Sequence, residues 1–422
     1  MWIPEGHIRI DDGRITAVGT GDWSGPSAGV IDGRGSVALP GFVNAHSHAN
    51  IGLYSGLWDR PNIAVPGDPY PRVPPYTSFM TADEHRDAAI LTMIAALRTG
   101  TTTLCSCERY EPATTVEAAD RVGIRTLSGV MANDPMFRSV GRPNWPDAAN
   151  ELAELALARA GDPLRRFFIG AHSLYSCSPE QIVEARARAR ELDVPFNIHL
   201  AEHPAEVAIA LERYGTSPVR ALDRLGVLDD RVIADHVIFV DDDDIDILGR
   251  RGVGIATCPL STAKSGAVAP LAAFIARGLR VGLGTDSLLS NNALSMLREL
   301  SLAIVLQRVR GAATALGPAD AIRLATLGSA DVLGWSSEIG SLEAGKAADI
   351  VLYDLRHPWG LDAERVAAGI VYEADRASVR TVLVGGRVVV DHGRVSTIDE
   401  DALSAELAGR YQGGGPRPWD RA

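Results

Sequence analysis

The chain has 422 residues, a hydrophobic fraction of 46% and a formal net charge of −12 at pH 7. It contains no run of about 18 apolar residues, which excludes a typical membrane-spanning helix, and its acidic balance argues against a nucleic-acid backbone as a partner. The first residues lack the basic and then apolar pattern of a signal peptide. Four cysteines are too few and too scattered for a disulfide framework. We therefore expect a cytoplasmic globular protein without nucleic-acid or membrane partners.

Both ends of the chain predict short strands. Apolar stretches bounded by turns occur at residues 8–10, 15–18, 349–353, 381–384 and 387–390. Because these strands lie on either side of a long middle region, they predict one composite β-sandwich domain formed from residues 1–38 and 336–422. Residues 39–335 are then a second, larger domain.

The middle region alternates short apolar runs with stretches that have a helical period. The predicted strands are residues 41–45, 101–105, 125–130, 166–171, 195–199, 231–235, 254–257 and 280–284. Helical stretches between them include residues 82–98, 179–192, 204–213, 270–277 and 293–308. This order predicts an α/β fold, a (β/α)8 TIM-type barrel, with an eight-stranded doubly wound sheet as the alternative. A dinucleotide site is not expected, because Gly33-Arg34-Gly35 is followed by neither the later glycine nor the helix that it needs.

A proline-rich segment, residues 59–76, interrupts the alternation and has no helical period. Such a segment favours a loop over the mouth of a pocket, with Trp58 packed under it. Four arginines are candidates for contact with an anionic group of the substrate: Arg60, Arg72, Arg138 and Arg142. The alternative is that they are ordinary exposed arginines of the surface.

Histidines fall where a barrel carries its chemistry, at the C-terminal ends of the strands. Five histidines and one aspartate follow predicted strands in this way: His46, His48, His172, His199, His236 and Asp286. Positions i and i+2 of a strand share a face, so His46 and His48 direct their imidazoles the same way. Two imidazoles, a third from another strand and a carboxylate suit Zn²⁺ or another borderline divalent ion. The sequence therefore predicts a metal-centred active site at this rim.

The stretch His199-Leu200-Ala201-Glu202-His203 also matches the H-x-x-E-H pattern of inverted zinc peptidases. That chemistry needs both histidines on one helical face. Residues 194–198 are typical of a strand, and Pro204 disfavours helix at His203. We therefore reject a peptidase site and interpret His203 as a bystander.

Three motifs in chain order resemble the amidohydrolase superfamily: Pro40-Gly41-Phe42-Val43-Asn44-Ala45-His46-Ser47-His48, then Ile198-His199-Leu200-Ala201-Glu202, then Gly284-Thr285-Asp286. The chain is most similar to the branch that holds cytosine, guanine and methylthioadenosine/S-adenosylhomocysteine deaminases and the triazine chlorohydrolases. The stretch 340–349 is similar to the return of that family into its small β domain. The resemblance covers nearly the whole chain.

This resemblance implies a role for each residue of the predicted site. The ligands of the metal ion would be His46, His48, His199 and Asp286. Glu202 matches the acid that shuttles a proton to a ring nitrogen of the substrate, and His236 matches the histidine that orients or polarises water. His172 resembles a substrate-contacting histidine of the purine-nucleoside deaminases.

The lysines favour a single metal ion. Dinuclear relatives bridge two metals with a carboxylated lysine on a middle strand, whereas Lys264 and Lys346, the two lysines of this chain, lie on no such strand. We expect one divalent ion, with Zn²⁺ as the first hypothesis and Fe²⁺ as the alternative.

The implied activity is that of an aminohydrolase. Hydroxide formed at the metal would attack a ring carbon that bears an amino group, with Asp286 as the base and Glu202 as the acid, and ammonia would leave. The partner would be a small heterocyclic substrate, with a purine or an adenosine-like ring as the first hypothesis, and the relatives imply a homodimer or larger assembly. Three alternatives stay open: hydrolytic removal of chloride or an alkylamine from an s-triazine, hydrolysis of a cyclic amide, and a non-catalytic scaffold.

Overall fold

The computed structural model describes residues 2–56, 59, 80–108, 111–132, 145–355 and 362–412. Most of the segment expected to cover the pocket mouth, and the side chains of Trp58, Arg60, Arg72, Arg138 and Arg142, lie outside these residues.

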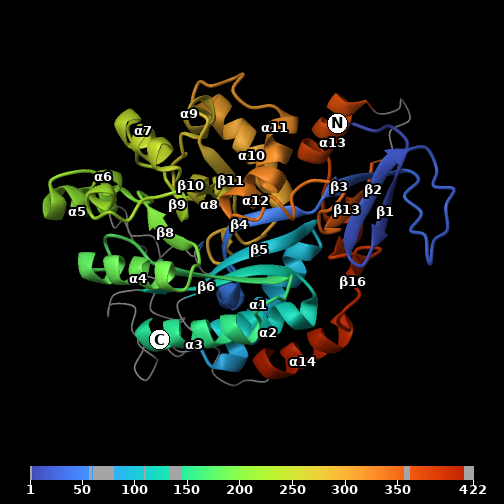
Figure 1. The fold of residues 1–422 in the computed structure, drawn as a ribbon, viewed down its shortest axis with the longest axis horizontal. Coiled ribbons are helices and arrows are strands. Elements are labelled where there is room, and N and C mark those ends of the chain that lie inside the picture. The colour runs from blue at the N-terminus through green and yellow to red at the C-terminus, as the bar shows by residue number, and fades with distance from the viewer. Residues whose placement is uncertain are drawn as a thin grey trace.

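Eight strands that follow one another in the chain lie side by side in the same order and run parallel (Figure 1). They are β4 (Phe42–His48), β5 (Thr101–Glu108), β6 (Arg125–Ala132), β7 (Arg165–Ala171), β8 (Phe196–Leu200), β9 (Val232–His236), β10 (Gly254–Thr257) and β11 (Arg280–Leu283). A short ninth strand, β12 (Asp286–Ser287), pairs in parallel with Ser47 and His48 of β4. Only two residues separate β11 from β12, so these two strands together form the last segment of the barrel. β11 pairs with β10 and β12 pairs with β4, so the sheet curls into the expected TIM-type barrel.

The closure of the barrel depends on a close backbone approach at Gly284, between β11 and β12. A Cβ at this position would lie 2.8 Å from the backbone nitrogen and oxygen of His46, which is closer than a side chain tolerates. The amide of the next residue, Thr285, donates to the carbonyl of His46 at 3.1 Å. The glycine therefore allows the last strand to lie directly against the strand that carries the first two histidines.

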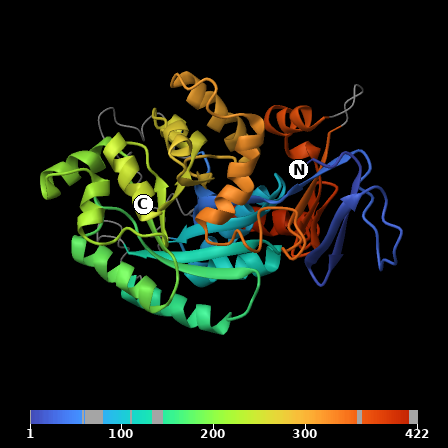
Figure 2. The same cartoon turned by 45° about the horizontal axis from the view of Figure 1, so that its top comes forward.

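Helices follow the strands and cover the outer face of the barrel (Figures 1 and 2). Those of the first half are α1 (Ala82–Leu97), α2 (Pro112–Val122), α3 (Trp145–Ala158), α4 (Pro179–Glu191), α5 (Pro204–Tyr214), α6 (Pro218–Arg224) and α7 (Asp242–Arg251). The later ones are α8 (Pro259–Lys264), α9 (Leu271–Ala276), α10 (Met296–Val309), α11 (Pro318–Arg323) and α12 (Ser329–Val332). Two further helices, α13 (Ala363–Tyr372) and α14 (Glu400–Gln412), come after the barrel, and there are short 3-10 helices at η1 (Ala49–Tyr54) and η5 (Arg376–Ser378) and a π-helix at η4 (Leu324–Gly328). Among the described residues, none of these helices is long and apolar enough to cross a membrane.

A second, antiparallel sheet brings the two ends of the chain together beside the barrel (Figures 1 and 2). From one edge to the other it consists of β16 (Arg394–Val395), β15 (Arg387–Asp391), β14 (Val379–Val384), β13 (Ile350–Asp354) and β3 (Ser36–Pro40). The hairpin of β1 (Gly6–Asp11) and β2 (Arg14–Thr20) packs on this sheet through the fully buried Ile15. This is the expected small β domain, while its exact limits at residues 38 and 336 stay a prediction.

A buried ion pair joins the barrel to the small domain. Arg125, the first residue of β6, donates from Nε and Nη2 to the two carboxylate oxygens of Asp349 at 2.7 and 3.0 Å. The guanidinium also stacks 5.2 Å from the ring centre of the buried Trp335, and Asp349 accepts the backbone amide of Gly385 at 2.7 Å. Each charge is thus hydrogen-bonded at a place that is almost closed to water.

We expect Arg125→Ala to lower the free energy of unfolding by about 3–5 kcal/mol, because it leaves the Asp349 carboxylate buried without its partner. Urea denaturation measures the change. The matched control is Arg34→Ala, which removes an ion pair to Asp32 whose side chains are 89% and 51% exposed, and which should leave the free energy of unfolding nearly unchanged because solvent screens such a pair. Equal losses in the two variants would contradict the role of the buried pair.

Candidate active site

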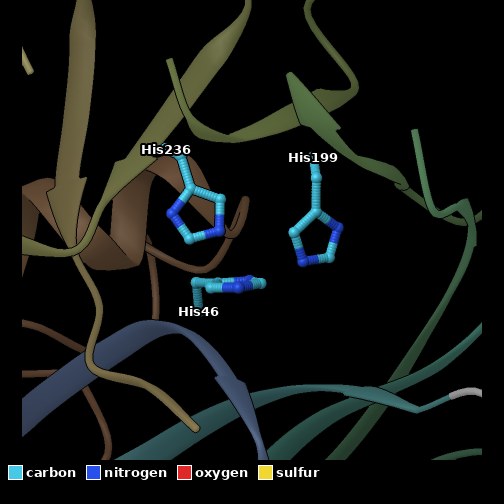
Figure 3. Close-up of side chains that lie close together, drawn as sticks. All are labelled: His46, His199 and His236. Carbon is cyan, nitrogen blue, oxygen red and sulfur yellow. The ribbon is translucent and has the colours of Figure 1, made fainter. Parts of the chain in front are cut away.

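Three histidines from separate strands converge at the C-terminal rim of the barrel (Figure 3). His46 lies on β4, His199 on β8 and His236 at the end of β9. The ring centre of His46 lies 4.9 Å from that of His199 and 5.0 Å from that of His236, and the latter two rings are 5.3 Å apart. All three side chains are buried, and one ring nitrogen of each lies within 4.8 Å of those of the other two.

His48 and Asp286 complete this group. The Nε2 atoms of His48 and His199 lie 3.3 Å apart, with their rings stacked. The Oδ1 atom of Asp286 lies 3.7 Å from Nε2 of His48, and donor atoms of His46, His48 and Asp286 all lie within 4.8 Å of one another. The structure thus brings together the four residues predicted as ligands, with His236 beside them.

The backbone adopts left-handed conformations at three places around this cluster. Ala201 has φ of 51°, His236 of 69° and Asp286 of 61°. Residues other than glycine rarely adopt positive φ, and such strain gathers at functional sites. At His236 the turn follows directly on Asp235, so both of these neighbouring side chains reach the cluster although a regular strand would place them on opposite faces.

Polar contacts behind two of the histidines, an ion pair at His46 and a hydrogen bond at His48, fix which nitrogen faces the centre. Nδ1 of His46 lies 2.9 Å from the carboxylate of the fully buried Asp235, which in turn accepts the side-chain amide of Asn197 at 3.2 Å. Nδ1 of His48 donates to the carbonyl of Cys107 at 2.5 Å. Both imidazoles therefore carry their proton on Nδ1 and present the lone pair of Nε2 to the centre. Among the described residues, Nε2 of His46 has no hydrogen-bond partner.

Asp286 is held on both of its oxygens. Oδ2 accepts the hydroxyl of Ser261 at 2.6 Å, and Oδ1 accepts the backbone amide of Ser287 at 2.7 Å. Sequence reasoning missed Ser261 and Asp235. The only signal for Asp235 was its place next to His236 at a strand end, and Ser261 lies on α8, a helix that carries no other predicted site residue.

The electrostatics differ between the members of the cluster. Burial lowers the pKa of the His46 imidazole, but the Asp235 carboxylate raises it by more, so its net pKa is above the ordinary value. Burial lowers the pKa of His199 well below its ordinary value, and the surrounding imidazoles lower it further. Burial raises the pKa of Asp286, but His236, His48 and His46 lower it by more, so its net pKa is below the ordinary value. Neutral imidazole nitrogens together with a carboxylate oxygen are the donors that a zinc-like divalent ion prefers. The residues present therefore fit such an ion.

Glu202 lies next to the histidine cluster, directly after β8. Its Oε1 atom lies 3.7 Å from Nε2 of His236 and 3.2 Å from Nε2 of His203. Burial raises the pKa of Glu202, but these two histidines lower it more, so the net pKa is below the ordinary value. His203, interpreted from the sequence as a bystander, in fact contacts this acid. Because α5 begins at Pro204, after both histidines of the H-x-x-E-H pattern, the rejection of a helical peptidase motif is confirmed.

His172 lies beside His199. It follows β7, its ring centre is 4.9 Å from that of His199 and 5.3 Å from that of Tyr175, and its Nδ1 lies 2.6 Å from the hydroxyl of Ser176. The structure therefore places the predicted substrate contact beside the cluster, on the same rim. Neither Lys264, which pairs with Asp59 at 2.9 Å, nor Lys346, which donates to the carbonyl of Ser336, belongs to the cluster.

Two buried glutamates that the sequence did not indicate hold the loops around the site. Glu206, in the first turn of α5, accepts the backbone amide of Glu202 at 2.9 Å. Glu299, in the first turn of α10, accepts the amide of Leu260 at 2.9 Å and the side-chain amide of Asn291 at 2.7 Å. Burial raises the pKa of both carboxyls to about 8. Each glutamate thus connects a helix of the barrel to a loop that carries a site residue.

A parallel barrel with histidines and acids gathered at its C-terminal rim is the arrangement of an enzyme. Residues 37–389 match the model of the amidohydrolase family, and the chain belongs to this family. It is accordingly a hydrolase that acts on carbon–nitrogen bonds.

Individual relatives are similar over nearly their whole length. A 5-methylthioadenosine/S-adenosylhomocysteine deaminase of Desulforudis audaxviator is 34% identical over 418 residues, which cover 94% of this chain and 92% of the relative. The solved structure of an adenosine deaminase from Xanthomonas campestris with bound zinc has a TM-score of 0.86 at 28% identity, covering 95% of this chain and 92% of that one. A triazine hydrolase from Arthrobacter aurescens has a TM-score of 0.83 at 25% identity, covering 96% and 94%.

The raised pKa of Glu206 gives a pH-dependent stability. Between its ordinary pKa of 4.5 and about 8, the folded state keeps a proton that the unfolded state has lost, so stability falls as the pH rises. Relative to Glu206→Gln, which cannot titrate, the unmodified protein should lose about 1.4 kcal/mol of unfolding free energy per pH unit in this window. Urea denaturation of both proteins at several pH values measures the difference. A difference that does not change with pH would show that this carboxyl titrates normally.

Proposed function

We propose that this protein is a metal-dependent aminohydrolase that removes an amino group from a nitrogen heterocycle, a purine or adenosine-like ring, and releases ammonia. The observation that carries the proposal is the position of Glu202 beside the convergent donors of His46, His48, His199 and Asp286. A cation site and a proton-carrying acid on one rim suit attack of water on a ring carbon. The names of the relatives, deaminases of methylthioadenosine and of adenosine, support this substrate class.

One divalent ion would be held by His46, His48, His199 and Asp286, with zinc as the first candidate and iron as the alternative. Such an ion, when bound, lowers the pKa of water from about 15.7 towards 7 and so supplies a nucleophile at neutral pH. The zinc in the adenosine deaminase structure supports this assignment. Asp235 and the carbonyl of Cys107 orient the first two imidazoles from behind.

The two acids divide the proton transfers between them. Both have pKa values below the ordinary range, so each starts as a carboxylate and each can take one proton of the attacking water. Glu202 carries the first proton to the ring nitrogen next to the attacked carbon as the carbon–oxygen bond forms. Asp286 accepts the second proton from the resulting hydroxyl group and gives it to the amino group. The carbon–nitrogen bond then breaks, ammonia leaves, and both acids are again ionised.

Two further histidines, His236 and His172, assist the two acids. His236, which faces both His46 and Glu202, orients the water and stabilises the negative charge that develops on the attacking oxygen. His172 lies beside His199, where it contacts the substrate ring or its substituent. Its hydrogen bond with Ser176 fixes the orientation of the imidazole.

Hydrolytic removal of chloride or an alkylamine from an s-triazine is the second candidate, and the similarity to a triazine hydrolase favours it. The same nucleophile would serve, but chloride needs no proton on leaving. Ammonia, unlike chloride, must take up a proton on leaving. The position of an acid, Glu202, beside the proposed metal site therefore supports a deaminase more strongly than a dechlorinase. A non-catalytic scaffold is disfavoured because all four ligand positions and both proton carriers are present.

We expect the purified protein to bind one divalent ion, and we expect Asp235→Asn to weaken metal affinity about 10–100-fold, because Asp235 orients the His46 imidazole from behind. Metal analysis and competition with a chelator measure this. Asp243→Asn, at a side chain that is 85% exposed, is the control and should bind metal like the unmodified protein. Loss of activity on chelation should be restored by zinc; a protein that binds no metal under these conditions would refute the site.

We expect Glu202→Gln to retain the metal and to lose about 10²- to 10⁴-fold in turnover, the usual contribution of a general acid or base. Activity is measured as ammonia released from a panel of purines, nucleosides, pyrimidines, pterins and triazines. Glu212→Gln, at an exposed position of the neighbouring α5, is the control.

Each outcome of this assay decides between the candidates. Ammonia from a purine or nucleoside supports the proposal, whereas chloride or alkylamine from a triazine supports the second candidate. Full ammonia release by Glu202→Gln would exclude Glu202 as the proton carrier.

A further inference from the structure

The buried Glu206 takes no part in the proton transfers described above, yet it contacts the residue that does. It lies in the first turn of α5, four residues after Glu202, and is fully inaccessible to solvent. Its carboxyl accepts backbone hydrogen bonds from Glu202, at 2.9 Å, and from Ala201. Among the described residues, its other oxygen, Oε1, has no hydrogen-bond partner. The hydrogen bonds of this buried acid are therefore made with the short turn that leads to Glu202.

That turn is strained and needs to be held. Ala201 has φ of 51°, a left-handed conformation that costs roughly 1–2 kcal/mol for a residue with a side chain. The turn lets Glu202 face the same cluster as His199, only three residues earlier. The carbonyl side of the turn is fixed by the amides of Ile238 and Phe239, which donate to the oxygen of Ala201 at 3.1 and 2.9 Å. Glu206 binds the amide side.

Fewer contacts hold the side chain of Glu202 than hold the backbone of its turn. Its Oε1 atom contacts two imidazoles, His203 at 3.2 Å and His236 at 3.7 Å, and the longer of these is beyond a normal hydrogen bond. The position of this carboxylate is therefore set mainly by the backbone to which it is attached. A displacement of about 1 Å at a reacting group is enough to reduce a rate about 100-fold.

We propose that Glu206 is a positioning residue for the proton carrier Glu202: its buried carboxyl holds the left-handed turn at Ala201 and thereby fixes the distance of Glu202 from the reacting ring. This inference rests on the proposed function of Glu202. It assigns no proton transfer to Glu206, so a side chain that accepts the same backbone hydrogen bond without titrating should serve as well.

Two substitutions of similar size separate positioning from general packing. Glu206→Gln keeps an oxygen that can accept the amide of Glu202, and we expect its kcat to stay within about threefold of the unmodified enzyme. Glu206→Leu keeps the volume but accepts no hydrogen bond, and we expect kcat to fall about 100-fold with KM and metal content unchanged. Glu206→Met serves in the same comparison if the leucine variant does not fold. Glu212→Leu, at the exposed side of the same helix, is the control for a change in α5.

A double-mutant cycle tests whether Glu206 acts through Glu202. In a Glu202→Gln background, Glu206→Leu should cause less than about a twofold further loss, because the group that it positions is already inactive. A further loss as large as in the unmodified background would overturn the proposal, as would full kcat in the Glu206→Leu and Glu206→Met variants.

Hydrogen exchange provides a readout that does not depend on the reaction. The amides of Ala201 and Glu202 should exchange faster in Glu206→Leu than in Glu206→Gln or the unmodified protein, since their acceptor is removed. If no substrate of the panel were hydrolysed, the proposed function would fail while this exchange measurement would still decide whether Glu206 holds the turn. Unchanged exchange in Glu206→Leu would overturn the proposal in either case.

Discussion

The contact of His46 with Asp235 determines the direction of the donor atoms at the centre of the barrel. Both side chains are completely buried, and a carboxylate in such a place needs a hydrogen-bonded partner. By taking Nδ1 of His46, Asp235 leaves Nε2 directed at the rings of His199 and His236. The same principle recurs at His48, where a backbone carbonyl replaces the carboxylate. The contacts behind these two histidines thus leave one ring nitrogen of each directed at the centre of the cluster.

Strand geometry alone does not place all the groups that the chemistry needs. The regular alternation of side chains delivers His46 and His48 to the rim, but Glu202, His236 and Asp286 reach it only through backbone turns that most residues avoid. Helices on the outside of the barrel supply what stabilises these loops: Glu206 from α5 and Glu299 from α10. The helices outside the barrel thus hold the strained turns inside it. Through such a turn, the proposed positioning residue Glu206 affects the reaction without contact to the substrate.

The sequence predicted the barrel well because parallel strands buried on both faces are continuous apolar runs. The limits predicted for the strand 254–257 are those of β10. The first predicted strand ends at residue 45, whereas β4 continues through His48. The rim histidines were predictable because strand ends in a barrel meet. Asp235, Ser261, Glu206 and Glu299 were not, since each is defined by contacts with a segment distant in sequence or by a left-handed turn at an ordinary residue. The contact of His203 with Glu202, its neighbour in the chain, was also missed.

The pairing of β12 with β4 has a consequence for the order in which the protein is made. His46 and His48 leave the ribosome long before Asp286, the residue beside which they finally lie, and β3, just ahead of them, must wait still longer for β13. An ion encountered by the nascent chain meets two imidazoles on an unfinished sheet and has little to retain it. The proposed metal site is therefore complete only after the last barrel strand has been made, and a polypeptide that stalls before Asp286 lacks one of its four proposed ligands.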